Sequence, residues 1–175
     1  HPTMILCVPL LIETMYHKIW ANIRKNGMEK MVKKALAASN ASRKIGIDLR
    51  KKLFSEIHET FGGKLRMMIA GGAAVDPDIL KGLRDFGILA VQGYGLTECA
   101  PLAAVNRDKF YCDSSAGLAT PNATLEIVDA AEDGTGDIRF KGENIMLGYY
   151  KAPELTAEVI VDGWLYTGDL GFIDK

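Results

Sequence analysis

A glycine-hinged segment of the chain carries the side chains with the clearest chemical use. It reads Q-G-Y-G-L-T-E, and it follows residues 88–91, an apolar run typical of a buried parallel strand. The glycines allow close backbone approach to a ligand. The tyrosine offers a flat face for a base, the threonine hydroxyl suits a phosphate oxygen, and the glutamate is a hard oxygen ligand for Mg²⁺. This pattern suits a nucleotide with its metal, and a plain turn with a core-packed tyrosine is the alternative that the spacing alone leaves open. The candidate residues are Gln92, Gly93, Tyr94, Gly95, Thr97 and Glu98.

Two further turns carry weaker signals. Residues 70–74, A-G-G-A-A, follow another strand-like run and leave an open backbone surface that could border a planar ring. They do not form the G-x-G-x-x-G dinucleotide fingerprint, and a tight strand-to-helix turn is the alternative. Asp169 ends the segment 162–169, D-G-W-L-Y-T-G-D. Its carboxylate could accept hydrogen bonds from both hydroxyls of a ribose, whereas a surface aspartate in a turn is the alternative.

The elements that must position these turns form a βαβ pattern. Residues 65–70 and 88–91 are strand-like, and between them Asp76 and Pro77 are a good N-cap and first residue for a helix that ends near Gly87. Strand, helix and strand over this length predict a right-handed unit in a parallel sheet. Ligands in open α/β sheets bind at the carboxyl ends of the strands, where the candidate turns lie.

The remaining chain divides into two kinds of sequence. An apolar strand at residues 4–8 is followed by patterns that predict helices up to about residue 61, whereas short strands and turns dominate after about residue 105. We therefore expect an α/β fold in which a parallel-sheet βαβ portion with a helical insert is followed by a β-rich portion, a partial barrel. The expected division is 1–105 and 106–175, both within one domain.

Composition is that of a soluble globular protein. The 175 residues are 48% apolar and 25% charged, and the longest apolar run has nine residues where a membrane-spanning helix needs about 20. Three cysteines and three histidines show no metal-ligand spacing, so free thiols in a reducing compartment are expected. The stretch 24–52 carries ten basic and two acidic residues on predicted helical surface.

Four motifs in order identify a family resemblance. Residues 92–98 resemble the Y-G-x-T-E motif of the adenylate-forming enzymes, which include acyl-CoA synthetases, luciferase-like enzymes and peptide-synthetase adenylation domains. Residues 71–75 are similar to their G-G-A-P-L turn, with Ala74 where the family often has proline. Residues 141–150 resemble G-E-x-x-M-x-G-Y-Y, and residues 162–169 resemble D-G-W-x-x-T-G-D. The resemblance covers essentially the whole chain.

The resemblance implies roles for the candidate residues. Gly72, Ala73 and Ala74 would line the adenine and the entrance for the acyl chain. Gln92, Gly93 and Tyr94 would hold the adenine, with Gly95 in the same cofactor-binding loop. Thr97 and Glu98 are the implied catalytic residues, since Thr97 would bind the α-phosphate of ATP and Glu98 would ligate Mg²⁺. Asp169 would bind the ribose hydroxyls, and residues 142–150 would be architectural.

The implied reaction has two steps. A carboxylate attacks the α-phosphate of ATP to give an acyl-adenylate and pyrophosphate, and a thiol, usually that of coenzyme A, then displaces AMP. The family's phosphate-binding loop and its C-terminal domain with a catalytic lysine have no counterpart in the sequence. We therefore expect a middle part of the large N-terminal domain, inactive by itself.

The basic helical stretch resembles the extra helices of long-chain fatty acyl-CoA synthetases, so a fatty acid is the expected substrate. An aryl- or medium-chain ligase and a luciferase-like enzyme are alternatives, as is a non-catalytic nucleotide-binding or structural piece; an NAD-binding domain is disfavoured. The expected partners are fatty acid, ATP and coenzyme A, without nucleic acid. We expect a cytoplasmic location, with peripheral membrane contact through the basic helices, and self-association through exposed apolar surface.

Overall fold

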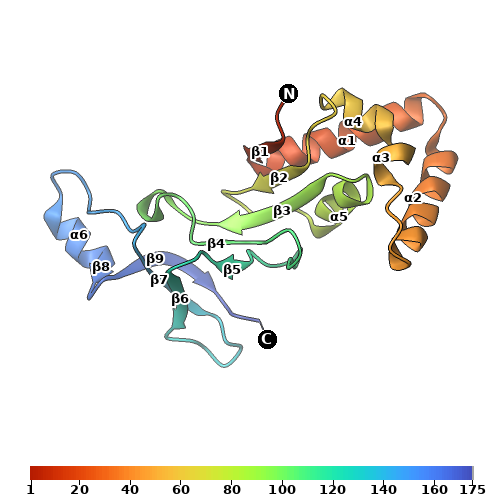
Figure 1. Ribbon diagram of the computed structural model, residues 1–175. Coiled ribbons are helices and arrows are strands. Elements are labelled where there is room, and N and C mark those ends of the chain that lie inside the picture. Colours follow the sequence, from red (N-terminus) through yellow and green to blue (C-terminus); the bar gives the residue numbers. More distant parts are fainter. Residues whose placement is uncertain (175) are drawn as a thin grey trace. The chain divides into compact units, whose positions relative to one another are not determined.

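Three parallel strands organise the first part of the chain. In the computed structural model, which describes residues 1–174, β1 (Met4–Cys7), β2 (Met67–Ala70) and β3 (Leu89–Tyr94) lie side by side in that order (Figure 1). Met67 of β2 is in register with Met4 of β1 and with Leu89 of β3. The predicted strand–helix–strand unit is confirmed.

Helix α5 (Pro77–Asp85) connects β2 and β3 and begins as the sequence predicts. The side chain of Asp76 accepts a hydrogen bond from the amide of Asp78 at 2.8 Å, and Pro77 is the first helical residue. The apolar face of α5, with Leu80 and Leu83 fully buried, packs with α1 (Pro9–Lys25) and with alternate residues of the sheet.

The three parallel strands are covered to different extents. Met68 and Ala70 of β2 are buried, whereas Met67 and Ile69 are half-buried, and Leu6 of β1 is 72% exposed. Continuous apolar runs predict burial on both faces. Only β3 matches this, with Ala90, Val91 and Gln92 buried in succession, whereas burial alternates along β2 and β1 contains no buried residue.

The helical insert differs from the prediction at one point. Helix α2 (Glu29–Lys44) is followed by two short helices, α3 (Arg50–Leu53) and α4 (Ser55–Thr60), where the periodicity predicts one helix over residues 47–61. The backbone leaves the helix at Phe54, with φ −119° and ψ 32°. Phe54 is 4% exposed, and its ring meets that of Phe86 edge-on at 5.2 Å, so this break accompanies the docking of Phe54 in an aromatic cluster.

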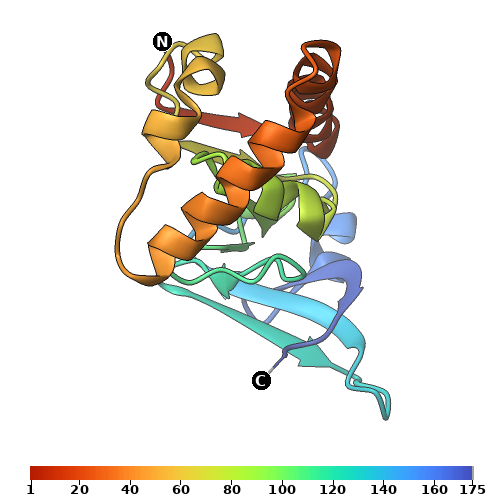
Figure 2. The same cartoon turned by 90° about the vertical axis from the view of Figure 1, so that its right-hand side faces the viewer.

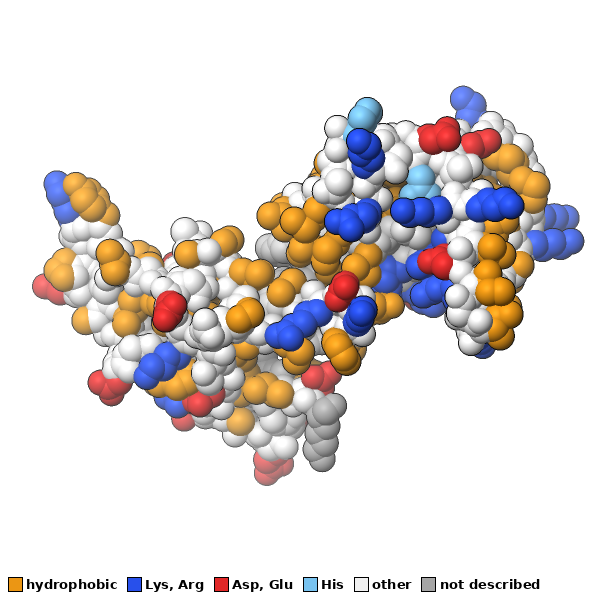
Figure 3. All heavy atoms as spheres, in the orientation of Figure 1, with side chains coloured by type: hydrophobic (Ala, Val, Ile, Leu, Met, Phe, Trp, Pro, Cys, Tyr) orange, Lys and Arg blue, Asp and Glu red, His pale blue; other side chains and the backbone are white. Residues whose placement is uncertain are grey.

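The basic residues of the insert lie on its surface. Of the ten lysines and arginines between residues 24 and 52, all except the half-buried Arg50 are exposed, and Figure 3 shows several of them over α2 and the short helices that follow it. The predicted basic helical surface is therefore present. None of the helices within residues 1–174 is long and apolar enough to cross a membrane.

The second part of the chain is mostly antiparallel. The end of β3 pairs with β4 (Ala104–Val105), and β4 pairs with β5 (Leu118–Ala119). A separate sheet has the order β6-β7-β9-β8, with β6 (Ala123–Val128), β7 (Gly136–Gly142), β8 (Ile160–Val161) and β9 (Trp164–Gly171). Figure 2 shows β6 and β7 as an antiparallel hairpin. A short 3₁₀ helix, η1 (Thr97–Cys99), and α6 (Pro153–Val159) complete this part.

The chain forms two compact units. The first comprises His1–Gln92 and Asn106–Ala116, and the second comprises Gly93–Val105 together with the residues from Gly117 onwards. The predicted fold class, an α/β portion with a helical insert followed by a β-rich portion, is confirmed. The predicted division at residue 105 stays a prediction.

Candidate nucleotide-binding site

In the first unit, Gln92 holds the turn at residues 71–75, G-G-A-A-V, through hydrogen bonds. Its side-chain oxygen Oε1 accepts a hydrogen bond from the amide of Val75 at 3.0 Å, and its Nε2 donates to the carbonyl oxygens of Asp113 at 2.7 Å and Ser115 at 3.3 Å. Gln92 is 6% exposed. Both ends of its carboxamide are therefore engaged within the chain, so the side chain acts on the turn at residues 71–75 rather than presenting itself to solvent.

Two buried polar residues hold the loop that Gln92 reaches. Arg84 of α5 donates to the carbonyl of Ala90 at 2.8 Å, forms an ion pair with the carboxylate of Asp113, and places its guanidinium 4.3 Å from the ring centre of Tyr111. The side chain of Asn106 donates to the carbonyl of Ser115 at 2.7 Å. Such buried groups require partners, and here they fix the segment Asn106–Ala116 on the first unit.

The sequence-based selection of site residues omits these polar anchors. A signal existed for Arg84, because it follows Leu80 by four positions and so lies on the apolar face of the predicted helix. No comparable signal marks Asp113, since the ion pair joins residues 29 positions apart.

The turn itself leaves space beside its backbone. Gly72 has φ +92°, and a Cβ built there would meet no heavy atom within 4 Å. Ala73 and Ala74 are exposed. Small residues around an open backbone fit the planar ring expected from the sequence.

In the second unit, two candidate residues 75 positions apart are in contact. The hydroxyl of Tyr94 donates a hydrogen bond to Oδ2 of Asp169 at 2.6 Å. Asp169 is held in turn, because its amide donates to Oγ1 of Thr167 at 3.2 Å and this hydroxyl donates to the carbonyl of Ile138 at 2.9 Å. Burial, and next the hydrogen bond to Asp169, raise the pKa of Tyr94 well above its usual range. Tyr94 is therefore a neutral phenol next to a carboxylate.

Thr97 and Glu98 follow in η1 of the same unit. Thr97 is exposed and Glu98 is half-buried. Oε1 of Glu98 accepts a hydrogen bond from the hydroxyl of Tyr149 at 2.9 Å, and the backbone carbonyl of Glu98 accepts one from the amide of Met146 at 2.7 Å. The hydrogen bond to Glu98, and next burial, raise the pKa of Tyr149. The sequence assigned residues 142–150 an architectural role, and it gave no sign of this contact.

The loop glycines serve the chain itself. A Cβ on Gly95 would lie 2.8 Å from Cα of Leu102 and closer still to the carbonyl oxygen of Pro101. A Cβ on Gly93 would lie 2.9 Å from the carbonyl oxygen of Ala104. Both positions therefore need glycine because the following segment crosses them at close range.

A magnesium ion brought by a nucleotide fits the donor set. Within residues 1–174 no group of three or more histidine, cysteine, aspartate or glutamate side chains could hold a metal by itself. Mg²⁺ commonly binds one or two carboxylates and completes its shell with water and substrate phosphates. A single fixed carboxylate at Glu98 suits that mode.

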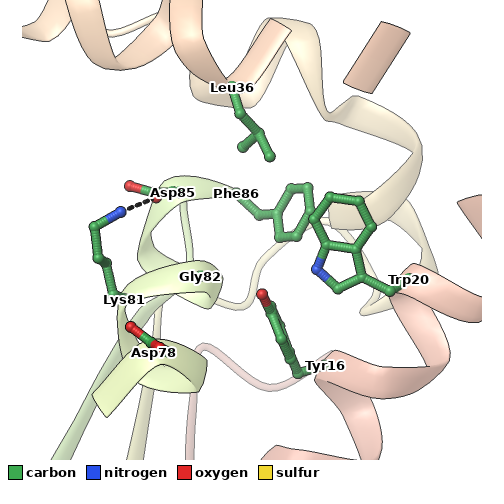
Figure 4. Close-up of a pocket in the computed structure, with 8 residues that line it drawn as sticks. All are labelled: Tyr16, Trp20, Leu36, Asp78, Lys81, Gly82, Asp85 and Phe86. Atoms are coloured by element: carbon green, nitrogen blue, oxygen red, sulfur yellow. Dashed lines mark hydrogen bonds and ion pairs between the residues drawn. The ribbon is translucent and has the colours of Figure 1, made fainter. Parts of the chain in front are cut away.

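A separate pocket of about 320 Å³ lies between the helices of the first unit. Aromatic rings form much of its wall, and the Lys81–Asp85 ion pair lies at its edge (Figure 4). Its lining consists of Tyr16, Trp20, Leu36, Asp78, Lys81, Gly82, Asp85 and Phe86. No residue predicted to bind nucleotide is among them.

Comparison with known proteins agrees with these motifs. A family model described as AMP-binding enzyme matches residues 1–150. The chain belongs to this family. The chain is 32% identical to long-chain-fatty-acid–CoA ligase 1 of Cavia porcellus over 97% of its own length and 26% of that protein. It is 43% identical to a long-chain-fatty-acid–CoA ligase of Salmonella typhimurium over 51% of its length and 17% of the relative. The chain thus spans about a quarter or less of the curated relatives it matches.

Two solved structures are similar to this chain over about two thirds of its length. An ATP-bound RpMatB-BxBclM chimera is 26% identical with a TM-score of 0.59, covering 71% of this chain and 27% of that one. The N-terminal domain of FACL13 from Mycobacterium tuberculosis is 26% identical with a TM-score of 0.56, covering 71% of this chain and 35% of that one.

Proposed function

We propose that this chain is the nucleotide-facing middle part of an AMP-forming acyl-CoA ligase that activates long-chain fatty acids. The observation that carries the proposal is the Tyr94–Asp169 hydrogen bond, because it joins the residue expected to stack on adenine to the one expected to hold the ribose. The relatives named above, two long-chain-fatty-acid–CoA ligases, support the substrate class.

Each unit contributes its own residues to the proposed reaction. In the first unit the turn at Gly72, Ala73 and Ala74 borders the acyl entrance, and Gln92 keeps this turn in place through Val75. In the second unit the ring of Tyr94 contacts the base. Its hydroxyl also donates to Asp169, which orients that carboxylate toward the ribose hydroxyls.

The chemistry is an in-line displacement at phosphorus. An oxygen of the fatty acid carboxylate attacks the α-phosphorus of ATP, the bond to pyrophosphate breaks, and an acyl-adenylate forms. The thiol of coenzyme A then attacks the acyl carbon and AMP leaves. Thr97 donates its hydroxyl proton in a hydrogen bond to the α-phosphate. Glu98 is the ligand for Mg²⁺, which neutralises phosphate charge when bound. Positioning and electrostatic complementarity of this kind carry most of the rate in such transfers.

The test is ATP–pyrophosphate exchange by the full-length protein that contains this sequence. Exchange should depend on palmitate or oleate and should be much weaker with benzoate or acetate. A preference for benzoate or acetate would overturn the long-chain assignment, and no exchange with any acid would favour a non-catalytic nucleotide-binding role.

Variants test the residues. Asp169→Asn should raise the KM for ATP and Glu98→Gln should lower exchange at limiting Mg²⁺. Glu132→Gln, an exposed glutamate of the hairpin turn, is the matched control and should behave as the unsubstituted protein. The cytoplasmic location, the membrane contact through the basic helices and self-association stay predictions.

A further inference from the structure

Tyr149 contacts the candidate metal ligand from a distant part of the sequence. Its hydroxyl lies 2.9 Å from Oε1 of Glu98, although the two residues are 51 positions apart. Both belong to the second unit. A tyrosine hydroxyl that donates to an ionised carboxylate forms a charge-assisted hydrogen bond, which is stronger than a neutral one.

The backbone of Tyr149 is anchored. Its amide donates to Oγ1 of Thr156 at 2.9 Å, and this hydroxyl donates to the carbonyl of Ala152 at 2.9 Å. Gly148 precedes it with φ +146°, and a Cβ there would meet Cγ2 of Thr156 at 2.8 Å. The tyrosine is thus fastened to the first turns of α6.

The backbone of Glu98 is held by the same segment. The amide of Met146 donates to the carbonyl of Glu98 at 2.7 Å. The side chain of Asn144 donates to the carbonyls of Cys99 at 2.5 Å and Leu102 at 3.0 Å. Residues 144–149 therefore form hydrogen bonds with the backbone of η1 and with the side chain of Glu98.

We propose that Tyr149 is a positioning residue for Glu98, which fixes the carboxylate in one orientation toward a divalent cation. The inference rests on the proposed function, because it assigns Glu98 to the metal. A glutamate side chain has several rotamers, and a hydrogen bond to one oxygen removes that freedom before the metal binds. Partners of this kind typically change metal affinity by about 10- to 100-fold when removed.

A purely packing role for the hydroxyl does not fit its surroundings. Tyr149 is 37% exposed, and its ring is not part of the core formed by Cys99, Phe140 and Leu165. Tyr149→Phe should therefore fold and melt close to the unsubstituted protein. The neighbouring Tyr150 is 89% exposed and provides a matched control at the same substitution.

The test measures metal binding directly in the full-length protein. Mn²⁺ is titrated in the presence of a non-hydrolysable ATP analogue, and free Mn²⁺ is followed by its electron paramagnetic resonance signal. Tyr149→Phe should weaken Mn²⁺ binding about 10-fold, whereas Tyr150→Phe should leave it unchanged. In exchange assays Tyr149→Phe should need more Mg²⁺ for half-maximal rate and should recover its kcat at saturating Mg²⁺.

The outcomes separate this inference from the proposed function. If Glu98→Gln weakens Mn²⁺ binding but Tyr149→Phe matches Tyr150→Phe, then Tyr149 does not position Glu98. If Glu98→Gln itself leaves Mn²⁺ binding unchanged, the metal assignment of Glu98 fails with it. Thr156→Val should reproduce part of the Tyr149→Phe effect, while Thr156→Ser, which keeps the hydroxyl, should not. Equal Mn²⁺ affinities of Thr156→Val and Thr156→Ser would contradict the proposal that Thr156 of α6 anchors Tyr149.

Discussion

Replacing Gln92 by methionine isolates the role of its carboxamide. Methionine has nearly the same length and volume, so the substitution removes the polar group without opening a large cavity. The amide of Val75 then loses its acceptor, and the carbonyl of Asp113 loses its donor. The carbonyl of Ser115 keeps the hydrogen bond from the side chain of Asn106 at 2.7 Å. One buried and one partly buried backbone group are therefore left without the partner that the glutamine supplied.

The expected loss of stability follows from those two groups. A buried donor or acceptor that loses its partner costs about 1–3 kcal/mol. Gln92→Met should therefore lower the free energy of unfolding by about 1–3 kcal/mol for the buried amide of Val75, and by less for the partly buried carbonyl of Asp113. At about 2–4 °C per kcal/mol for a chain of this size, a loss near 3 kcal/mol lowers the melting temperature by about 6–12 °C.

Urea unfolding of the chain, followed by far-ultraviolet circular dichroism, measures this loss. Lys109→Met introduces the same side chain at an exposed position of the neighbouring loop and should change stability by less than about 0.5 kcal/mol. Gln92 is the sole glutamine in the sequence, so its side-chain NH₂ gives one recognisable pair of amide resonances, and these protons should exchange slowly with solvent. Equal stability of the two methionine variants, or a rapidly exchanging Gln92 amide, would refute this account of the turn.

Three further predictions concern the second unit. Gly95→Ala should destabilise the chain in urea unfolding, because its Cβ would collide with the backbone of Pro101, whereas alanine at Gly71 would meet open space without a positive φ and serves as the control. Phe140→Ala should cost about 3–5 kcal/mol of unfolding free energy, since the ring is fully buried, and the exposed Phe110→Ala should cost far less. Burial first, and then Asp169, raise the pKa of Tyr94, so the folded state holds this proton more tightly than the unfolded state. That contribution to stability is complete below pH of about 10 and declines as pH rises toward the raised pKa. Tyr94→Phe should therefore lose less stability than the unsubstituted protein between pH 9 and pH 11 in urea titrations. The same pH dependence of the unfolding free energy in both proteins would contradict a raised pKa of Tyr94 in the folded state.

Local signals in the sequence were sufficient to predict the βαβ unit. Asp76 and Pro77 define the start of α5 through a cap and a fixed φ, both of which act within a few residues. The helical periodicity over residues 47–61 was misleading at Phe54, because the benefit of placing that ring against Phe86 depends on a residue 32 positions away. Period and propensity carry no information about such a partner.

The same distinction applies to the candidate site. Residue types identified Glu98 and Asp169 as useful carboxylates, because their motifs are contiguous in the chain. Their supporting partners, Tyr149 and Tyr94, lie 51 and 75 positions away, and the hydrogen bonds between them appear only in the folded unit. Contiguous motifs in the sequence can therefore suggest candidate residues, Tyr94 among them, but not the hydrogen bonds that join one motif to another.

Glycine shows why residue type alone cannot separate function from architecture. Gly72 and Gly95 both stand in candidate nucleotide turns, yet a Cβ on Gly72 meets open space while one on Gly95 meets the backbone at Leu102. A substitution at Gly95 should disrupt the local fold whether or not a ligand ever approaches it, because the chain itself needs the space. At Gly72 the positive φ of 92° sets the cost of adding a side chain, and the vacant space is free for a ligand. Loss of nucleotide binding on substitution is therefore uninformative about a ligand at Gly95, and at Gly72 it has to be separated from the backbone strain by a parallel measurement of stability.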